Sequence, residues 1–560
     1  MSGPAVRGAC WCFALVILMV APFGGALARH DADAISAALL QRAGEAQLVG
    51  PERAASHPAL TQAVLDAYRD RDWRPVWFVS GSVAEEAAAR ARLAAALAVL
   101  EDAAREGLGP EDYAVAVRAE GLPGFAARAT PQGLAPLDAQ ATAAILAYAR
   151  DAATGRRGPA RLDSNVFAPP RDFDAAAILE ALADPTRDAG AMLRALSPGH
   201  TEYRGLRRAL SLYRALAEKP EPPPVPDGPS LKPGIRDPRV AALRARLAHF
   251  GDISVPEAEP DLFTPALEIA LASFQRRHGL ETDGIAGKQT LAALNVTVAE
   301  RVDQILLNME RWRWLPHDLG PRYVLANIAG YEVTMVEGTS TVDRMVAVVG
   351  RPYRMTPVFS DRISYIEVNP TWTVPPKIAR EDLLPKIQAD PAYLESGGYE
   401  VFSGWDADAA RLDPQAVDWQ AMTKERFGFK LRQAPGPKNA LGEVKIMFPN
   451  RFDIYLHDSP AKDLFDRRVR AFSSGCIRLA RPFDLVDWLM RQTGGPDRAA
   501  IEEIRQSRET RVVKLPETVP VHLIYATAWA GEDGQTHFRA DVYERDRLLA
   551  RALAEERQKP

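Results

Sequence analysis

Two short stretches, IYLHDS at residues 454–459 and FSSGCIRL at residues 472–479, decide the fold and the chemistry expected of this chain. They place one imidazole, one thiol and a glycine turn within a single short segment. A neighbouring imidazole that takes the proton of a thiol lowers the thiol pKa from about 8.5 to below neutral. We therefore expect His457 to ionise Cys476, so that the pair acts as base and nucleophile. The alternative is that both side chains are structural, because lone cysteines are often buried as small hydrophobes.

The flanking residues predict how this pair is presented. Alternating apolar residues at 452–456 predict a strand that delivers His457 to its end. Gly475 lets the backbone bend tightly just before the cysteine. Such a bend can aim the N–H groups of Ser474, Gly475 and Cys476 at one point, as an oxyanion site requires.

The N-terminus has the pattern of a Sec-type export signal. Arg7 precedes an apolar run at 9–24, and ALA at 26–28 fits a cleavage site. We predict a signal peptide at 1–28 and a location in the periplasm or cell envelope. An uncleaved anchor, the only membrane contact expected, remains the alternative because the apolar segment is near the length that spans a bilayer. Cleavage would leave Cys476 as the only one of three cysteines, so that no internal disulfide could form.

Composition excludes several classes of protein. Apolar residues make up 47% and charged residues 25% of the 560 residues, which is ordinary for a globular protein of several domains. The net charge of −4 argues against a nucleic-acid partner. The nine histidines form no H-x-H or H-E-x-x-H pair, so we predict no metal site, and no residue pattern indicates a cofactor.

Patterns along the chain predict a multidomain α+β protein. Ala- and Leu-rich helical spacing comes first, a Pro-rich stretch follows, and short β-rich runs separated by turns begin at Arg322. Two runs, Val519–Ala526 and His537–Val542, predict a closing strand pair. The predicted units are a signal peptide or anchor at 1–28, a helical scaffold at 33–217, a linker at 218–228, a small three-helix unit at 229–297, a linking helix at 298–318, a mostly-β, sandwich-like domain at 319–544 with an insertion at about 378–433, and a charged surface helix at 545–560.

The motif residues resemble a known family. HDSP at 457–460, a basic run, and RAFSSGCIR at 470–478 resemble the YkuD-type L,D-transpeptidase catalytic domain, in particular its large YcbB-like subgroup. That family often has His directly before Gly-Cys; here Ser474 stands there, as in the large subgroup, which leaves His457 as the only local base. The resemblance implies Cys476 as the acyl-accepting nucleophile, His457 as general base, and the insertion as a cap over the donor peptide.

A second resemblance concerns the three-helix unit. Its stretch FQRRHGLETDGIAGKQT at 274–290 is similar to the peptidoglycan-binding helical module. The usual Gln of the first helix is absent, because Ala242-Leu243-Arg244 stands there. Glycan binding and a role as a simple spacer therefore both stay open.

Several side chains are candidates for substrate contact. Arg478 and Tyr455 lie two residues from the nucleophile and the base, and Arg478 could hold a substrate carboxylate or form a structural ion pair. We also expect Trp372 and Asn439 to contact substrate. Asp458 is not expected to orient His457, because adjacent strand residues point to opposite faces. A backbone carbonyl or another side chain could do so.

The resemblance also implies partners and an activity. The donor would be a tetrapeptide stem of peptidoglycan, D-Ala would leave, and a 3-3 cross-link would join two diaminopimelate residues. Carbapenems would acylate Cys476. Two alternatives remain: an NlpC/P60-like cysteine hydrolase, whose base would follow the nucleophile as His522 or His537, and a non-catalytic wall-binding protein.

Overall fold

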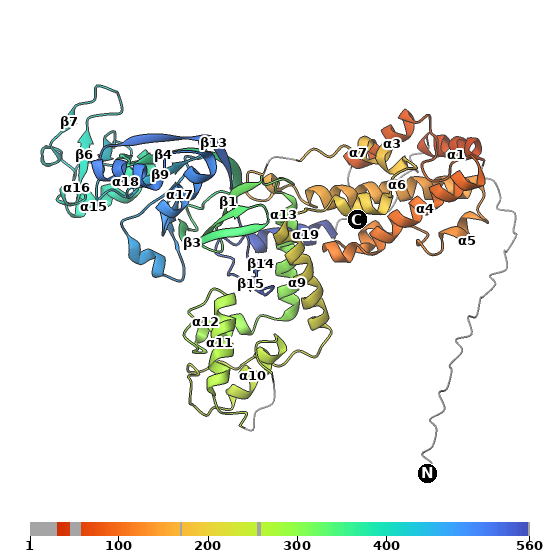
Figure 1. Cartoon of the computed structure of the whole chain (residues 1–560), viewed down its shortest axis with the longest axis horizontal. Coiled ribbons are helices and arrows are strands. Elements are labelled where there is room, and N and C mark those ends of the chain that lie inside the picture. The colour runs from red at the N-terminus through yellow and green to blue at the C-terminus, as the bar shows by residue number, and fades with distance from the viewer. Residues whose placement is uncertain (1–30, 45–57, 169–170, 255–258, 558–560) are drawn as a thin grey trace, which may run out of the picture.

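The structure, a computed structural model, describes residues 31–44, 58–168, 171–254 and 259–557. Figure 1 shows a helical N-terminal lobe, a small helical lobe and a β-rich lobe, which meet around α9 (Thr201–Ala217), α13 (Val298–Arg313) and α19 (Arg545–Arg557). This arrangement confirms the predicted multidomain α+β class. The expected signal segment lies outside the described residues. Within the described ranges, no helix is both long enough and apolar enough to span a membrane.

The N-terminal lobe is a set of helices packed on one apolar core. Leu93 and Leu97 are buried there, as the predicted apolar face requires. Trp77 is also buried, and its Nε1 donates to Thr142 Oγ1 at 3.0 Å, so it is a core aromatic. The helices of this lobe before α9 are α1 (Ala32–Gly44), α3 (Pro58–Asp70), α4 (Val83–Glu101), α5 (Leu122–Ala126), α6 (Pro131–Thr154), α7 (Ala175–Ala183) and α8 (Ala189–Ala195).

The small helical lobe contains α10 (Arg239–His249), α11 (Pro265–Arg277) and α12 (Lys288–Leu294). Gln275 of the sequence motif lies inside it, where its Nε2 donates to Asp283 Oδ1 at 2.8 Å and Thr290 Oγ1 at 3.2 Å. These motif residues therefore hold the fold of the lobe together. The Pro-rich segment lies against the lobe, because Val225 is buried in its core.

The β-rich lobe is built on a sheet that closes on itself. The strand order β3-β12-β10-β9-β4-β13-β1-β2 returns to β3, so the eight strands of this ring have no free edge. Strand β11 pairs with β3 outside the ring, and helices α17 (Pro482–Thr493) and α18 (Arg498–Ser507) contribute to the same core. The strands are β1 (Arg322–Asn327), β2 (Glu332–Glu337), β3 (Ser340–Gly350), β4 (Phe359–Val368), β9 (Val444–Met447), β10 (Leu456–His457), β11 (Ala471–Ser473), β12 (Ile477–Leu479) and β13 (Arg511–Ile524).

The insertion is a subdomain with its own core and sheet. Its strands pair in the order β5-β8-β6-β7. The sequence predicted that the insertion begins at about residue 378, whereas its sheet already begins at Trp372, because strands of two to four residues carry little periodicity. The elements are β5 (Trp372–Thr373), α14 (Pro376–Ile378), α15 (Leu384–Ala389), α16 (Tyr393–Ser396), β6 (Tyr399–Phe402), β7 (Arg411–Leu412) and β8 (Lys430–Gln433).

Two predictions for the C-terminal part are wrong. The expected closing strand pair does not form: β13 pairs with β1 and β4, while β15 (Thr536–Phe538) pairs with β14 (Ala528–Ala530). The last helix is not wholly a surface element, since Leu549 is buried in the core of the β-rich lobe. The strand pairing was missed because the partners of β13 lie far away in the sequence. The burial of the last helix was missed because it depends on a single apolar side chain.

The junction between the ring and the insertion is tightly fastened. Asn369, directly after β4, has φ +51°, a left-handed conformation that Asn tolerates. Its Nδ2 donates to the carbonyls of Ile504 at 2.9 Å and Arg505 at 3.1 Å, and its own carbonyl accepts from Thr510 Oγ1 at 2.7 Å. Asn369 therefore sets the direction in which the chain enters the insertion.

We expect Asn369→Ala to lower the free energy of unfolding by about 1–3 kcal/mol, because it removes buried hydrogen bonds and puts alanine at positive φ. Differential scanning calorimetry should show the transition of the β-rich lobe falling by about 2–8 °C. Asn369→Gly is the matched control: it loses the same hydrogen bonds without the backbone cost and should fall less. An alanine variant that melts with the wild type would contradict this role.

Candidate active site

Parallel pairing of β10 with β12 brings the predicted catalytic residues together. The register pairs Leu456 with Ile477 and His457 with Arg478. Because alternate residues of a strand point to opposite faces, Leu456 and Ile477 enter the core. Tyr455, His457, Cys476 and Arg478 share the other face, and all four line one cleft.

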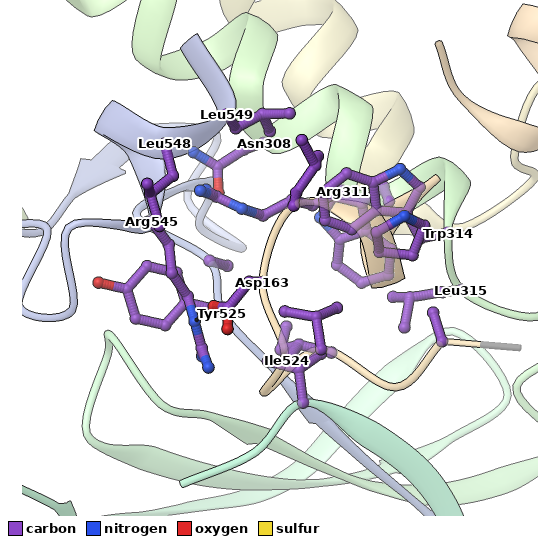
Figure 2. Close-up of a pocket in the computed structure, with 17 residues that line it drawn as sticks. Asp163, Asn308, Arg311, Trp314, Leu315, Ile524, Tyr525, Arg545, Leu548 and Leu549 are labelled. Atoms are coloured by element: carbon purple, nitrogen blue, oxygen red, sulfur yellow. Dashed lines mark hydrogen bonds and ion pairs between the residues drawn. The ribbon is translucent and has the colours of Figure 1, made fainter. Parts of the chain in front are cut away.

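This cleft has a volume of about 1480 Å³. Its floor is the ring of strands, and one wall belongs to the insertion, which contributes Trp372 and Tyr399, with ring centroids 6.4 Å apart. Figure 2 shows a different and much smaller cavity of about 50 Å³ between α13, α19 and β13, beside the ion pair of Arg545 with Asp163. None of the residues lining that cavity is a cysteine or histidine, so the chemistry belongs to the larger cleft.

The loop that carries the nucleophile is held by buried hydrogen bonds. Gly475 has φ +127°, which favours glycine, and its carbonyl accepts from Thr356 Oγ1 at 2.7 Å. The main-chain N–H of Thr356 donates to the Tyr543 hydroxyl at 3.2 Å, and that hydroxyl donates to the Gly350 carbonyl. The turn before Cys476 is thus fixed from the last strand-to-helix connection of the chain.

The structure leaves fewer main-chain N–H groups for an oxyanion site than the sequence predicts. The N–H of Gly475 donates to Ser473 Oγ at 3.1 Å, so it is already used inside the loop. Ser473 Oγ in turn donates to the Cys476 carbonyl at 2.6 Å. Of the three N–H groups considered, those of Ser474 and Cys476 remain as candidates to face an oxyanion.

Burial dominates the electrostatics of the nucleophile. Cys476 is half-buried at the cleft floor, and desolvation raises the pKa of its thiol to about 11. Hydrogen bonds from the Tyr455 main chain and hydroxyl, and the charges of Lys445 and Arg478, pull this pKa down by less. The expectation that an imidazole keeps the thiol ionised at rest is therefore wrong: Cys476 rests as a thiol that donates to the Asp453 carbonyl at 3.5 Å.

His457 is neutral at rest. Burial, reinforced by the positive charge of Arg478, lowers its pKa to about 3, while the carbonyls of Asp458 and Leu441 act in the opposite direction. The unfolded chain binds a proton near pH 6.5, so His457 stabilises the fold above that pH and loses this contribution as pH falls toward 3. A neutral buried imidazole can accept a proton, as a general base must.

The second ring nitrogen of His457 is not held by a carboxylate. Its Nδ1 has no partner of good hydrogen-bond geometry in the described part of the chain, although the two carbonyls lie close enough to act on its pKa. The Asp458 carboxylate is engaged elsewhere, with Lys462 Nζ at 2.5 Å and the Glu443 N–H at 3.0 Å. This agrees with the expectation that Asp458 does not orient His457.

Three of the four candidate substrate residues line the cleft. Arg478 points there with a buried Nε that has no partner among the described residues, and Tyr455 and Trp372 lie beside it. Asn439 does not: it is buried and donates to the Pro370 carbonyl at 2.8 Å. Its position supports the junction with the insertion rather than contact with substrate.

Two cleft residues, Lys445 and Arg354, were not predicted from the sequence. Lys445 pairs with His457 across β9 and β10, and its alternation with Val444 and Ile446 could have indicated its direction. Arg354 donates to Ser474 Oγ at 3.0 Å and forms an ion pair with Asp382 of the insertion. The ion pair of Arg354 with Asp382 depends on tertiary structure alone, so no local sequence pattern could have indicated it.

A thiol and an imidazole on the same face of one cleft are the groups that cysteine-nucleophile acyl transfer uses. Three family models match the chain: a scaffold domain at 62–210, a putative peptidoglycan-binding domain at 236–294, and the YkuD L,D-transpeptidase catalytic domain at 321–513. Residues 321–513, which include His457 and Cys476, thus match an L,D-transpeptidase catalytic domain, and residues 236–294 match a putative peptidoglycan-binding domain. The family resemblance read from the motifs is confirmed.

A curated relative, a putative L,D-transpeptidase of Haemophilus influenzae, is 33% identical over 246 residues, which are 44% of this chain and 48% of the relative. The chain thus matches about half the length of that relative.

Solved L,D-transpeptidases are more distant. One from Stackebrandtia nassauensis is 13% identical, with 55% of this chain and 97% of that chain covered and a TM-score of 0.21. One from Mycobacterium smegmatis is 12% identical, with 36% and 58% covered and a TM-score of 0.17. One solved in complex with imipenem is 13% identical, with 36% and 59% covered and a TM-score of 0.17. Scores this low carry no argument about the present chain.

The thiol pKa predicts how alkylation of Cys476 depends on pH. With a pKa of about 11, only about one molecule in 10⁴ is a thiolate at pH 7. The rate of iodoacetamide labelling, read by mass spectrometry on the peptide that contains Cys476, should rise about tenfold per pH unit from 7 to 10 without a plateau. The urea-unfolded chain, as control, should level off above pH 8.5; a plateau below pH 8 in the folded chain would contradict the raised pKa.

Proposed function

We propose that the chain is a peptidoglycan L,D-transpeptidase that forms 3-3 cross-links through a cysteine thioester. The observation that carries this proposal is the strand pairing that sets Cys476 and His457 on one face of one cleft, within the matched catalytic domain. The substrate class comes from the family resemblance and from the peptidoglycan-binding domain match.

The resting charges suit a mechanism in which proton transfer accompanies attack. His457 takes the thiol proton as Sγ of Cys476 attacks the donor carbonyl, and the N–H groups of Ser474 and Cys476 face the oxyanion. The imidazolium then protonates the leaving amine of D-Ala, which gives the thioester. An acceptor amine attacks the thioester and gives a proton to neutral His457, and the sulfur leaves with that proton. A general base typically contributes about 10²–10⁴-fold and an oxyanion donor about 10²–10³-fold.

Positive charge around the sulfur supports this order of reaction steps. Lys445 and Arg478 lower the thiol pKa, so they stabilise the thiolate that forms during attack. The buried Nε of Arg478, which has no partner in the described part of the chain, also favours a carboxylate ligand, as a stem peptide offers. Carbapenems, which carry a carboxylate beside an acylating carbonyl, are proposed to acylate Cys476. Export to the periplasm is part of the same proposal.

The hydrolase alternative needs a base that follows the nucleophile in sequence. Neither His522 nor His537 lines the cleft. His522 lies between Ser360 Oγ at 2.8 Å and the Leu319 carbonyl at 3.1 Å, and His537 stacks on Trp529 with ring centroids 5.4 Å apart. Both are accounted for by packing, so this alternative has no base near Cys476.

Incubation of the protein with defined disaccharide tetrapeptides, followed by mass spectrometry, should give cross-linked dimers and one D-Ala per bond. Cys476→Ala should abolish the product, and His457→Ala should lower the rate by about 10²–10⁴-fold, since the general base is lost. His537→Ala is the matched control and should keep wild-type rates. Cleaved stems without dimers would support a hydrolase, and stems left unchanged by the wild type would support a non-catalytic binding protein.

Gly475→Ala should slow acylation of Cys476 by a carbapenem about 10²-fold, because displacement of a nucleophile by an ångström has effects of that size. A Cβ at this positive φ would lie 3.1 Å from Ile454 Cδ1. Gly494→Ala is the control: its φ is +71° and nothing lies within 4 Å of the new Cβ. Mass spectrometry of the adduct over time gives the rates, and equal rates in both variants would contradict a fixed nucleophile turn.

A further inference from the structure

A segment of the N-terminal lobe reaches the catalytic cleft. Val166 forms a parallel bridge with Val358, just before β4. The Phe167 N–H donates to the Val358 carbonyl at 2.8 Å, and the Val358 N–H donates to the Asn165 carbonyl at 2.8 Å. Val166 is buried in the core of the β-rich lobe. The segment is thus an added strand-like piece of the catalytic lobe, although it is distant in sequence.

The two neighbours of Val166 form a further wall of the cleft, beside the floor and the wall that belongs to the insertion. Asn165 and Phe167 both line it, because alternate residues of an extended segment point the same way. Phe167 packs on Phe452 with ring centroids 4.1 Å apart. The side-chain amide of Asn165 has one weak contact, to Met355 Sδ at 4.0 Å, so its hydrogen-bonding capacity is largely open to a ligand.

The charges of the cleft divide between its sides. The insertion and the floor contribute the cations Lys377, Lys386, Lys445 and Arg478, of which Lys445 pairs with Glu367 of β4 at 3.6 Å. The insertion's carboxylates Glu381 and Asp382 are neutralised by Arg354.

On the side of Asn165 lies Asp453, whose carbonyl accepts from Cys476 Sγ at 3.5 Å. Its exposed carboxylate is in none of the ion pairs of the described residues. Arg451, a nearby exposed cation, lies over the Phe167 ring at 4.8 Å, on the aromatic pair.

We propose that Asn165, Phe167 and Asp453 form the subsite for the acceptor amine, so that the N-terminal lobe takes part in the second half-reaction. This inference rests on the proposed transpeptidase function. A donor stem carries carboxylates, which the cations of the insertion and floor attract, whereas an acceptor presents an ammonium group, which needs oxygen ligands and negative charge. The Asp453 carboxylate and the Asn165 amide oxygen supply both in the cleft that contains the sulfur.

The attack of the acceptor amine on the thioester can be written with these groups, His457 and Cys476. The acceptor binds as an ammonium ion and loses one proton to water, and its nitrogen attacks the thioester carbonyl. The C–N bond forms as the C–S bond breaks. The second amine proton passes to His457 and then to the departing sulfur of Cys476. Asn165 and Asp453 touch the acceptor only, so the first half-reaction does not need them.

The test separates the two half-reactions in the full chain. Wild type and variants receive a defined tetrapeptide donor and increasing amounts of a diaminopimelate-containing tripeptide acceptor, and D-Ala release and cross-linked product are both measured by mass spectrometry. We expect Asn165→Ala and Asp453→Asn to raise the acceptor KM about tenfold with little change in D-Ala release without acceptor. Asn165→Asp, which adds a negative charge, should lower the acceptor KM.

The opposite directions of the two Asn165 variants cannot both come from misfolding. Ser164→Ala is the matched control, because Ser164 is exposed on the same segment and does not line the cleft. An acceptor KM within twofold of wild type in all three site variants, or an equal loss of both half-reactions, would overturn the acceptor subsite. Absence of transfer in the wild type would instead overturn the proposed function, and this inference with it.

Discussion

Two residue pairs in parallel register support the whole catalytic arrangement. Strand β10 contributes only Leu456 and His457, and it lies between β9 and β12 in the closed ring. A slip of one residue would turn His457 into the core and Leu456 into the cleft. The ring resists such a slip, because each strand is bonded on both sides and no edge is free to move. A nucleophile and base separated in sequence thus behave as one rigid unit.

Burial of this unit has opposite effects on its two members. It raises the thiol pKa and lowers the imidazole pKa, so both groups rest uncharged. A protonated thiol reacts slowly with oxidants, so the resting state of Cys476 resists oxidation. Substrate that fills the cleft replaces the remaining water, and the charges of Lys445 and Arg478 then act at low dielectric on the forming thiolate. Reactivity therefore depends on occupation of the cleft.

The sequence was sufficient where the signal was local. The motif residues His457 and Cys476, the apolar faces of long helices and the β-rich character after Arg322 could all be predicted. The thiol pKa could not, because it depends on how many atoms surround the sulfur. Asn439 looked like a substrate residue, whereas its amide is used to fasten a loop. Asn165 and Phe167 carried no signal, since their place in the cleft arises from one bridge to Val358.

The segment 351–358 explains why separate lobes act on one thiol. Alternate residues of this segment contact different parts of the chain. Arg354 joins the insertion to Ser474, and Thr356 holds the Gly475 carbonyl and meets Tyr543. Val358 carries the bridge from the N-terminal lobe. The insertion, the nucleophile turn and the N-terminal lobe are thus bonded to one short piece of backbone. A displacement of the insertion that breaks the Arg354 ion pairs changes the support of the nucleophile loop directly, without a path through the protein core. The placement of the insertion and the support of the nucleophile loop are therefore linked through residues that are close neighbours in the sequence.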